Sequence, residues 1–130
     1  MTQENKELLL KDLCARLQYG VKVNVTYSNE NASSFRQRVC TEGVNVLNTD
    51  IIGLYQRNEI DIKPYLFQLS SMTEKQKEEL MELMYKADTP FGAIFSENID
   101  YFDWLNKHHF DYRGLIEKGL AIDATGLNIY

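Results

Sequence analysis

The chain has 130 residues, of which 44% are hydrophobic and 25% charged, and its formal net charge is −5. These values are ordinary for globular proteins and argue against a disordered or collagen-like chain, and no apolar run approaches the length of a membrane-spanning helix. The length predicts one domain, covering residues 1–130. The polar N-terminal residues do not resemble a secretory signal, so we expect a cytoplasmic protein with reduced cysteines and no membrane contact.

The charge is unevenly distributed. Residues 1–72 contain eight basic and eight acidic residues, whereas residues 73–130 contain six basic and eleven acidic ones. Nucleic-acid-binding proteins usually carry a basic patch, because neutralising phosphates supplies much of their affinity. The linear sequence shows no such patch, and it favours a soluble protein with a mildly acidic face.

Residues 5–18 are predicted to form the first helix. Leu10, Leu13, Cys14 and Leu17 recur at helical spacing, which places them together on the buried face. Gly20 suits the position that follows a helix C-terminus. We interpret Cys14 as a small buried hydrophobic residue rather than as a nucleophile.

The next segments predict a sheet. Val21, Val23 and Val25 alternate with polar residues, which is typical of a strand over residues 21–27. Further strands are predicted over residues 35–40, 44–47 and 51–56. The short links between these segments favour an antiparallel arrangement.

The second predicted strand carries the one basic cluster that the sequence suggests. Arg36 and Arg38 would share a face of that strand, and Lys22 would join them from a neighbouring strand. A solvated outer face of a half-buried sheet is the preferred interpretation, and nucleic-acid association is the alternative. No aromatic residues are interleaved there to stack on bases.

The C-terminal half predicts helices. Thr73 to Gln76 is a T-x-x-Q capping box that opens a helix ending near Ala87. Ser96 is expected to cap a helix over residues 97–109, and Asp111 a short helix that ends near Gly119. Residues 65–69 are interpreted as an apolar connector. The predicted fold class is therefore α+β, with an N-terminal helix, a three- to four-stranded antiparallel sheet and a helical C-terminal half.

Catalytic and metal sites find little support in the sequence. Neighbouring side chains on a helix point about 100° apart, so His108 and His109 are poorly placed to share a metal. Neither a nucleophile elbow nor a glycine-rich phosphate loop is present. We expect no catalytic residue, no metal and no cofactor. A minor enzyme or metal site near His108, with Asp103 and Asp111 nearby in sequence, is the second alternative.

Aromatic residues point instead to an interaction surface. Eight of the 15 aromatic residues lie between residues 85 and 112, which is also the most acidic stretch. Ile99 and Phe102 are expected on the buried face of the helix over 97–109. An exposed patch formed by some of Tyr101, Trp104 and Tyr112 would have Asp100, Asp103 and Arg113 at its rim. Core packing accounts for much of this pattern, but Tyr, Trp and Arg are the residues that anchor protein interfaces. The candidates for binding a protein partner are Tyr101, Trp104, His108, Tyr112 and Arg113.

Three stretches also carry a resemblance to other proteins. They are residues 7–17 (ELLLKDLCARL), residues 62–73 (with IKPYL and LSSMT) and residues 104–121 (WLNKHHFDYRGLIEKGLA). Together they resemble a group of small uncharacterised proteins of gut Bacteroidales genomes and their phages. The resemblance implies a bacterial or phage cytoplasmic setting but assigns no activity and no functional residue. The predicted function is that of a small accessory or modulatory protein of such a mobile-element system, acting by protein–protein interaction.

Overall fold

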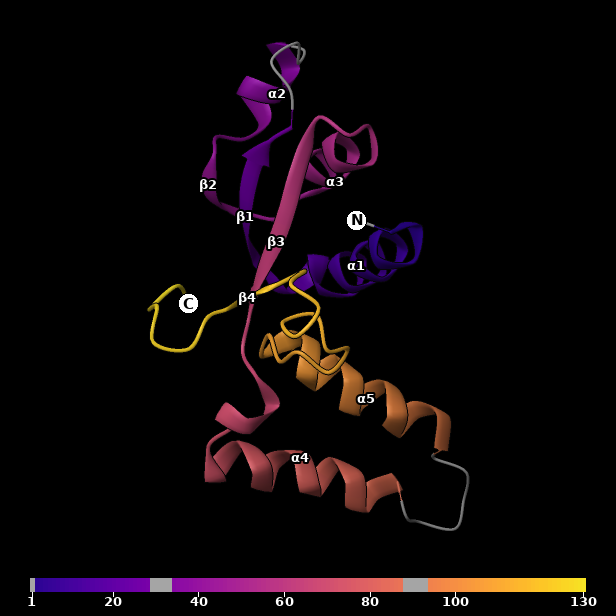
Figure 1. Cartoon of the computed structure of the whole chain (residues 1–130). Helices are drawn as coiled ribbons and strands as arrows, with labels where there is room; N and C mark the ends of the chain where they lie inside the picture. Colours follow the sequence, from indigo (N-terminus) through magenta and orange to yellow (C-terminus); the bar gives the residue numbers. More distant parts are fainter. Residues whose placement is uncertain (1, 29–33, 88–93) are drawn as a thin grey trace.

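The computed structural model describes residues 2–28, 34–87 and 94–130 (Figure 1). Its elements in chain order are α1 (Gln3–Arg16), the 3-10 turn η1 (Leu17–Tyr19), β1 (Lys22–Tyr27), α2 (Ser34–Val39), β2 (Gly43–Val46), α3 (Thr49–Gln56), β3 (Ile60–Leu66), the 3-10 turn η2 (Leu69–Ser71), α4 (Glu74–Ala87), α5 (Ile94–Lys107) and β4 (Ile122–Asp123). The α+β class and the N-terminal helix are confirmed. Within these residues no helix combines the length and apolarity that crossing a membrane requires.

The sheet has four strands in the order β2-β1-β3-β4. The central strand β1 pairs antiparallel with both β2 and β3, so that Val23 lies opposite Asn45 on one side and Pro64 on the other. The last strand, β4, pairs parallel with β3, with Ile122 opposite Tyr65. The sheet is therefore mixed, and the prediction of a wholly antiparallel sheet was wrong on this point.

Two of the predicted strands are helices. Residues 35–40 fall largely in α2, and residues 51–56 form most of α3. The side chain of Asn48 caps α3 by accepting a hydrogen bond from the backbone N–H of Ile51 at 2.9 Å. Helices therefore also lie between the strands of the N-terminal half. Conversely, Tyr65 and Leu66 belong to a strand, where the sequence suggested a connector.

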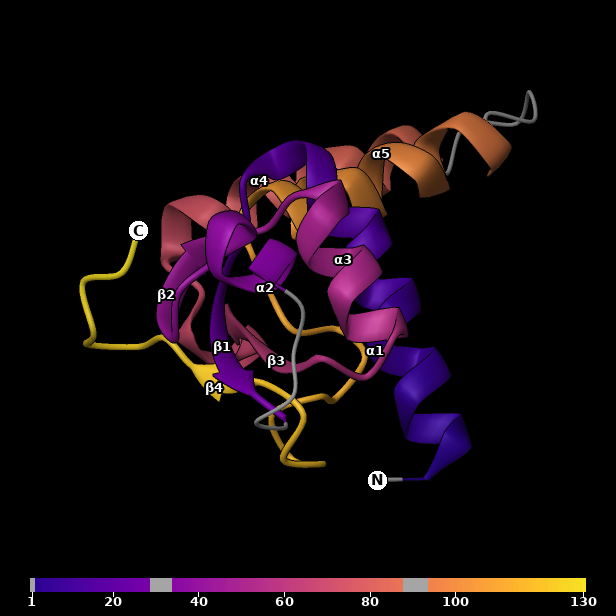
Figure 2. The same cartoon turned by 90° about the horizontal axis from the view of Figure 1, so that it is seen from above.

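The main core lies between the sheet and the two helices that cover one of its faces, α1 and α3 (Figure 2). Val21, which precedes β1, and the β1 residues Val23 and Val25 are buried there, as their alternation predicted. On the opposite face the edge strand β2 exposes Val44 and Val46. Each fully buried valine or leucine side chain contributes about 1.5–3 kcal/mol to stability.

Helix α1 is rotated relative to the predicted stripe. Leu9 and Leu13 are fully buried, and so are the charged side chains of Asp12 and Arg16. Cys14 is exposed, so its assignment to the buried face was wrong. The rotation has a physical cause, because Asp12 and Arg16 satisfy each other and other partners inside the protein.

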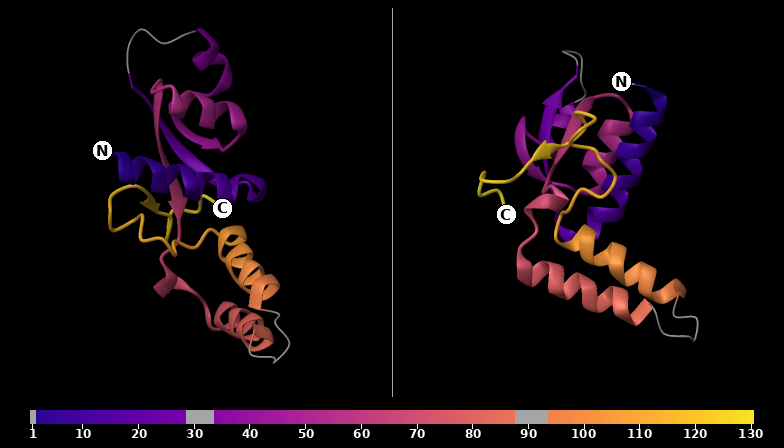
Figure 3. Two further views of the ribbon diagram at one scale, coloured as in Figure 1. Left: turned by 90° about the vertical axis from the view of Figure 1, so that its right-hand side faces the viewer. Right: turned by 60° about the horizontal axis from the view of Figure 1, so that its bottom comes forward.

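Helices α4 and α5 pack side by side as an antiparallel hairpin that projects from the sheet and its covering helices (Figure 3). The capping box at the start of α4 is confirmed: Thr73 N donates to Gln76 Oε1 at 2.9 Å, and Gln76 N donates to Thr73 Oγ1 at 3.2 Å. Helix α5 begins at Ile94, three residues before the predicted start. A smaller buried cluster of Met72, Leu105 and Phe110 holds the hairpin to the rest of the chain.

Residues 111–119 form turns rather than the predicted short helix. Asp111 nevertheless acts as a cap, because its carboxylate accepts hydrogen bonds from the backbone N–H groups of Leu115 and Ile116, each at 2.9 Å. Gly119 adopts a positive φ of 73°, in keeping with its predicted place at the end of the segment.

Candidate functional site

An exposed group of aromatic rings lies where α5 meets the segment that follows it. The ring of Phe102 packs edge-on against Tyr101, with 5.3 Å between centroids, and lies 5.1 Å from the ring of Tyr112. We call these three residues the Phe102 cluster. Phe102 is 44% exposed, whereas the two tyrosines are half-buried. The sequence interpretation had placed Phe102 on the buried face of the helix, and the structure corrects it.

The back of the Phe102 cluster is fixed to α1. The Tyr112 ring has the Arg113 guanidinium 4.5 Å from its centroid and that of Arg16 at 5.5 Å. Arg113 Nη1 also donates to Asp12 Oδ1 at 2.8 Å. The Tyr112 hydroxyl is 3.0 Å from Asn106 Oδ1. These contacts hold Tyr112 in one orientation.

Trp104 and His108 form a separate pair on the side of α5 that faces α4. The Trp104 ring stacks on Phe110, with centroids 5.7 Å apart and planes 5° apart, and lies 4.4 Å from the His108 ring. Its Nε1 donates to Glu79 Oε2 at 3.3 Å. Trp104 therefore connects the two helices of the hairpin. Of the five interaction candidates, the structure groups Tyr101, Tyr112 and Arg113 around Phe102 and places the other two apart from them.

Arg16 is the largest fully buried side chain among the described residues. Its Nε donates to Asp12 Oδ2 at 2.9 Å, and its Nη2 donates to the carbonyl oxygen of Phe110 at 2.6 Å. Asp12 binds Arg113 as well, so one buried carboxylate serves two guanidinium groups. The buried face predicted for the first helix did not include Asp12 and Arg16. Their i, i+4 spacing was the signal for the ion pair, but it carried no information about burial.

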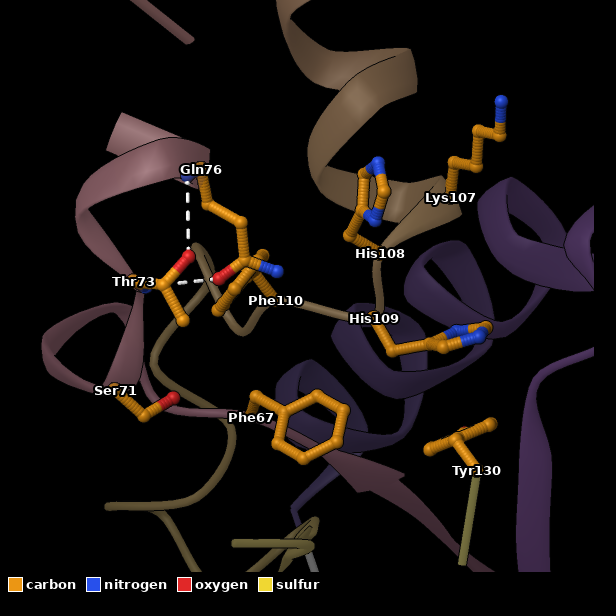
Figure 4. A pocket seen from close by; sticks show the side chains of 9 residues that line it. All are labelled: Phe67, Ser71, Thr73, Gln76, Lys107, His108, His109, Phe110 and Tyr130. Atoms are coloured by element: carbon orange, nitrogen blue, oxygen red, sulfur yellow. Dashed lines mark hydrogen bonds between the residues drawn. The ribbon is translucent and has the colours of Figure 1, made fainter. Parts of the chain in front are cut away.

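A cavity of about 450 Å³ lies between the first turn of α4, the end of α5 and the end of β3 (Figure 4). Its apolar walls are Phe67, Phe110 and Tyr130, and polar side chains of α4, α5 and η2 line the remainder. His109 is one of the lining residues, with its ring stacked on Tyr130 at 3.9 Å between centroids. Sequence reasoning considered His109 as a poorly placed metal ligand and did not bring it together with Tyr130.

His109 occupies an unusual backbone position. It has a φ of 63°, the left-handed conformation that glycine usually supplies after a helix. His109 N donates to Asn106 O at 3.1 Å and Phe110 N donates to Leu105 O at 2.9 Å, the two hydrogen bonds of a Schellman motif that ends α5. A side chain in this conformation costs about 1–2 kcal/mol relative to glycine. Burial, reinforced by the charges of Arg16 and His108, lowers the pKa of His109 to about 4.

His108 also favours the neutral form. Burial lowers its pKa, an effect that Glu79 opposes and Lys107 reinforces. Both histidines at the cavity therefore carry less positive charge than an exposed histidine at the same pH. Within the described part of the chain, no three histidine, cysteine or acidic side chains converge as metal ligands would.

The basic cluster expected on the sheet does not form. Arg36 lies on α2 rather than on a strand and is buried, with its guanidinium 3.9 Å from the centroid of the Tyr27 ring. Lys22 lies at the opposite end of β1, about 17 Å away at about 3.3 Å per residue, and its amine donates to the carbonyl oxygen of Ile129. Arg38 is exposed on α2. The three residues therefore do not share a sheet face.

Comparison of the chain with protein-family models, with curated proteins and with solved structures finds no match. The resemblance to proteins of Bacteroidales and their phages, and the cytoplasmic location, therefore stay predictions from the sequence.

Proposed function

We propose that this chain is a small accessory or modulatory protein, from a bacterial or phage system, that binds a partner protein through the Phe102 cluster. The observation that supports the proposal is the exposure of Phe102 between two ordered tyrosines. A single exposed aromatic ring is common on protein surfaces, but here three rings are in contact and Arg113 lies beside them. Tyr and Arg are the residue types on which binding energy concentrates at interfaces.

The cluster suits binding because little of it has to become ordered. Tyr112 is held by Asn106 and by two guanidinium groups, and Tyr101 packs against the buried cluster around Leu105. Each flexible side chain that becomes fixed at an interface costs about 0.5–1.5 kcal/mol. A surface that is already fixed avoids much of this cost.

The charge around the cluster indicates the chemistry of the partner. Asp100 is exposed and Asp103 half-buried on the same helix. Residues 74–83 and 100–107 of the hairpin contain six acidic and three basic residues. Opposite charges steer two proteins together and raise their association rate. The partner we propose therefore presents an apolar side chain flanked by lysines or arginines.

The two alternatives receive less support. Nucleic-acid association was based on a sheet face shared by Lys22, Arg36 and Arg38, but Lys22 lies on β1 whereas Arg36 and Arg38 lie on α2. A metal or catalytic site near His108 requires converging ligands or a nucleophile beside a base. Glu79 and Lys107 are the charged residues that act on the pKa of His108, and together they supply neither arrangement.

The experiment compares Phe102→Ala with Val46→Ala, which shortens an exposed apolar side chain on β2, far from the hairpin. Each tagged protein is used for affinity purification from a nuclease-treated lysate of a Bacteroidales culture, and bound proteins are quantified by mass spectrometry. We expect one partner to bind the wild type and Val46→Ala and to be lost with Phe102→Ala. Equal recovery with all three proteins would contradict the proposal, and recovery that needs intact nucleic acid would favour the alternative.

A further inference from the structure

The cavity beside His109 has the dimensions and walls of a small-molecule site. Its volume, about 450 Å³, lies within the range of about 300–1,000 Å³ that is typical of ligand pockets. The centroid of the Phe67 ring is 5.8 Å from that of Tyr130 and 6.1 Å from that of Phe110, so the three rings form a continuous apolar wall. Such a wall accommodates a planar apolar group.

The polar part of the lining contains no carboxylate. Lys107, His108 and His109 line the cavity, yet no aspartate or glutamate does, although the surrounding stretch of sequence is acidic. Gln76 uses Oε1 to accept from Thr73 N, and its Nε2 therefore extends from the first turn of α4 into the cavity (Figure 4). The partial positive charge at the N-terminus of α4 adds to this field.

His109 supplies an independent indication of a ligand. Its side chain is only 9% exposed, and among the described residues its Nδ1 has no hydrogen-bond partner. A buried polar atom without a partner is costly, and a histidine in the left-handed conformation adds to that cost. Glycine would satisfy the backbone at this position, so the imidazole is retained against a local energetic preference.

We infer that this cavity binds a small organic anion, with its anionic group at Gln76, His109 and Lys107 and its apolar body against Phe67 and Tyr130. The ligand class is an aromatic or other planar apolar group that carries one carboxylate or phosphate. The site is separate from the Phe102 cluster and does not depend on the proposed partner protein.

The key variant is Gln76→Glu. A glutamate at this position keeps the capping box, because its carboxylate accepts from Thr73 N as the amide does. It replaces the Nε2 donor by a negative charge inside the cavity. The matched control is Gln37→Glu, which adds the same charge to an exposed residue of α2.

Benzoate and phenyl phosphate are the probes, and binding is followed by the chemical shifts of backbone amides during titration. We expect at least one probe to bind the wild type and Gln37→Glu with a Kd near or below about 1 mM, with shifts at residues 73–76 and 107–110. The Gln76→Glu protein should bind it about tenfold more weakly or worse, because like charges repel at short range. The probe that binds more tightly identifies the anionic group.

Three results would overturn the inference. One is the absence of binding by the wild type to both probes up to about 10 mM. Another is unchanged affinity in a Gln76→Glu protein whose thermal unfolding matches that of the wild type. The third is equal binding of phenyl phosphate and inorganic phosphate, which would remove the role of the apolar wall.

Discussion

Asp12 and Arg16, one turn apart on α1, form an ion pair in which neither side chain has any exposed surface, with Nε and Oδ2 2.9 Å apart. The pair is completed by Arg113, whose Nη1 binds the second oxygen of Asp12 at 2.8 Å. Two charges taken out of water are tolerated only when each finds its partners. Here the partners come from opposite ends of the chain, so the buried charges connect α1 to the segment after α5.

Replacement of Asp12 is expected to destabilise the folded protein strongly. Asp12→Asn leaves two guanidinium groups without their counter-charge, one of them fully buried, and should lower the free energy of unfolding by roughly 3–5 kcal/mol. Urea denaturation followed by circular dichroism measures the loss. The matched control is Glu74→Gln, which breaks the exposed pair with Lys77 and should cost less than about 1 kcal/mol. Equal losses in the two variants would show that burial of the first pair has no energetic consequence.

Trp104 and Phe102 are expected to differ in how much they contribute to stability. Trp104→Ala removes a ring that stacks on Phe110 and binds Glu79, and should cost about 2 kcal/mol of stability because the side chain is half-buried. Phe102→Ala removes a ring that is 44% exposed and should cost less than about 1 kcal/mol. Thermal unfolding of both variants makes the comparison. If Trp104→Ala is as stable as the wild type, the role of Trp104 in joining α4 to α5 is wrong.

The capping box of α4 allows a test of a single hydroxyl. Thr73→Ala removes the acceptor for Gln76 N and should lower stability by about 1 kcal/mol, whereas Thr73→Ser keeps the acceptor and should cost much less. Denaturant titrations of the two variants separate the hydroxyl from the methyl group. A serine variant as unstable as the alanine variant would mean that the methyl group, and not the cap, carries the effect.

His109 is expected to make stability depend on pH. Its pKa is about 4 in the folded protein, below the ordinary value of 6.5, so the unfolded chain binds more protons between these two values. Stability should therefore fall as the pH falls from about 6.5 to about 4, and His108 contributes in the same direction. His109→Asn tolerates the left-handed backbone and should flatten this part of the profile. Melting temperatures of the wild type and His109→Asn, measured across that pH range, test this expectation. Parallel profiles for the two proteins would contradict the role of His109.

The sequence was informative where a local pattern and the tertiary structure agree. Alternating valines gave β1, and Thr73 with Gln76 gave the start of α4, because each pattern is satisfied by neighbours in sequence. The segment over residues 51–56 shows the opposite case. Its run of apolar residues fits a strand or a short buried helix equally well, and Asn48 as an N-cap was the signal that decided it.

Other features depend on partners that no local pattern reveals. Strand β4 has only two residues, and its pairing with β3 is parallel and distant in sequence. Residues 35–40 were predicted as a strand, but the helix α2 lets Arg36 and Cys40 be buried one turn apart. The cavity was missed for a related reason: Gln76, His109 and Tyr130 come from three separate segments, and the spacing between such segments follows no motif.

The buried charges of α1 also affect the order in which the chain can fold. Asp12 and Arg113 are 101 positions apart, and Arg16 reaches the Phe110 carbonyl across 94 positions. Helix α1 is therefore completed by groups that a ribosome synthesises 94 and 101 positions later. Until residues 110–113 have been synthesised, α1 cannot be buried without leaving Arg16 Nη2 and the second oxygen of Asp12 without their partners. We expect α1 to dock late in folding, because these contacts between distant parts of the sequence must form first.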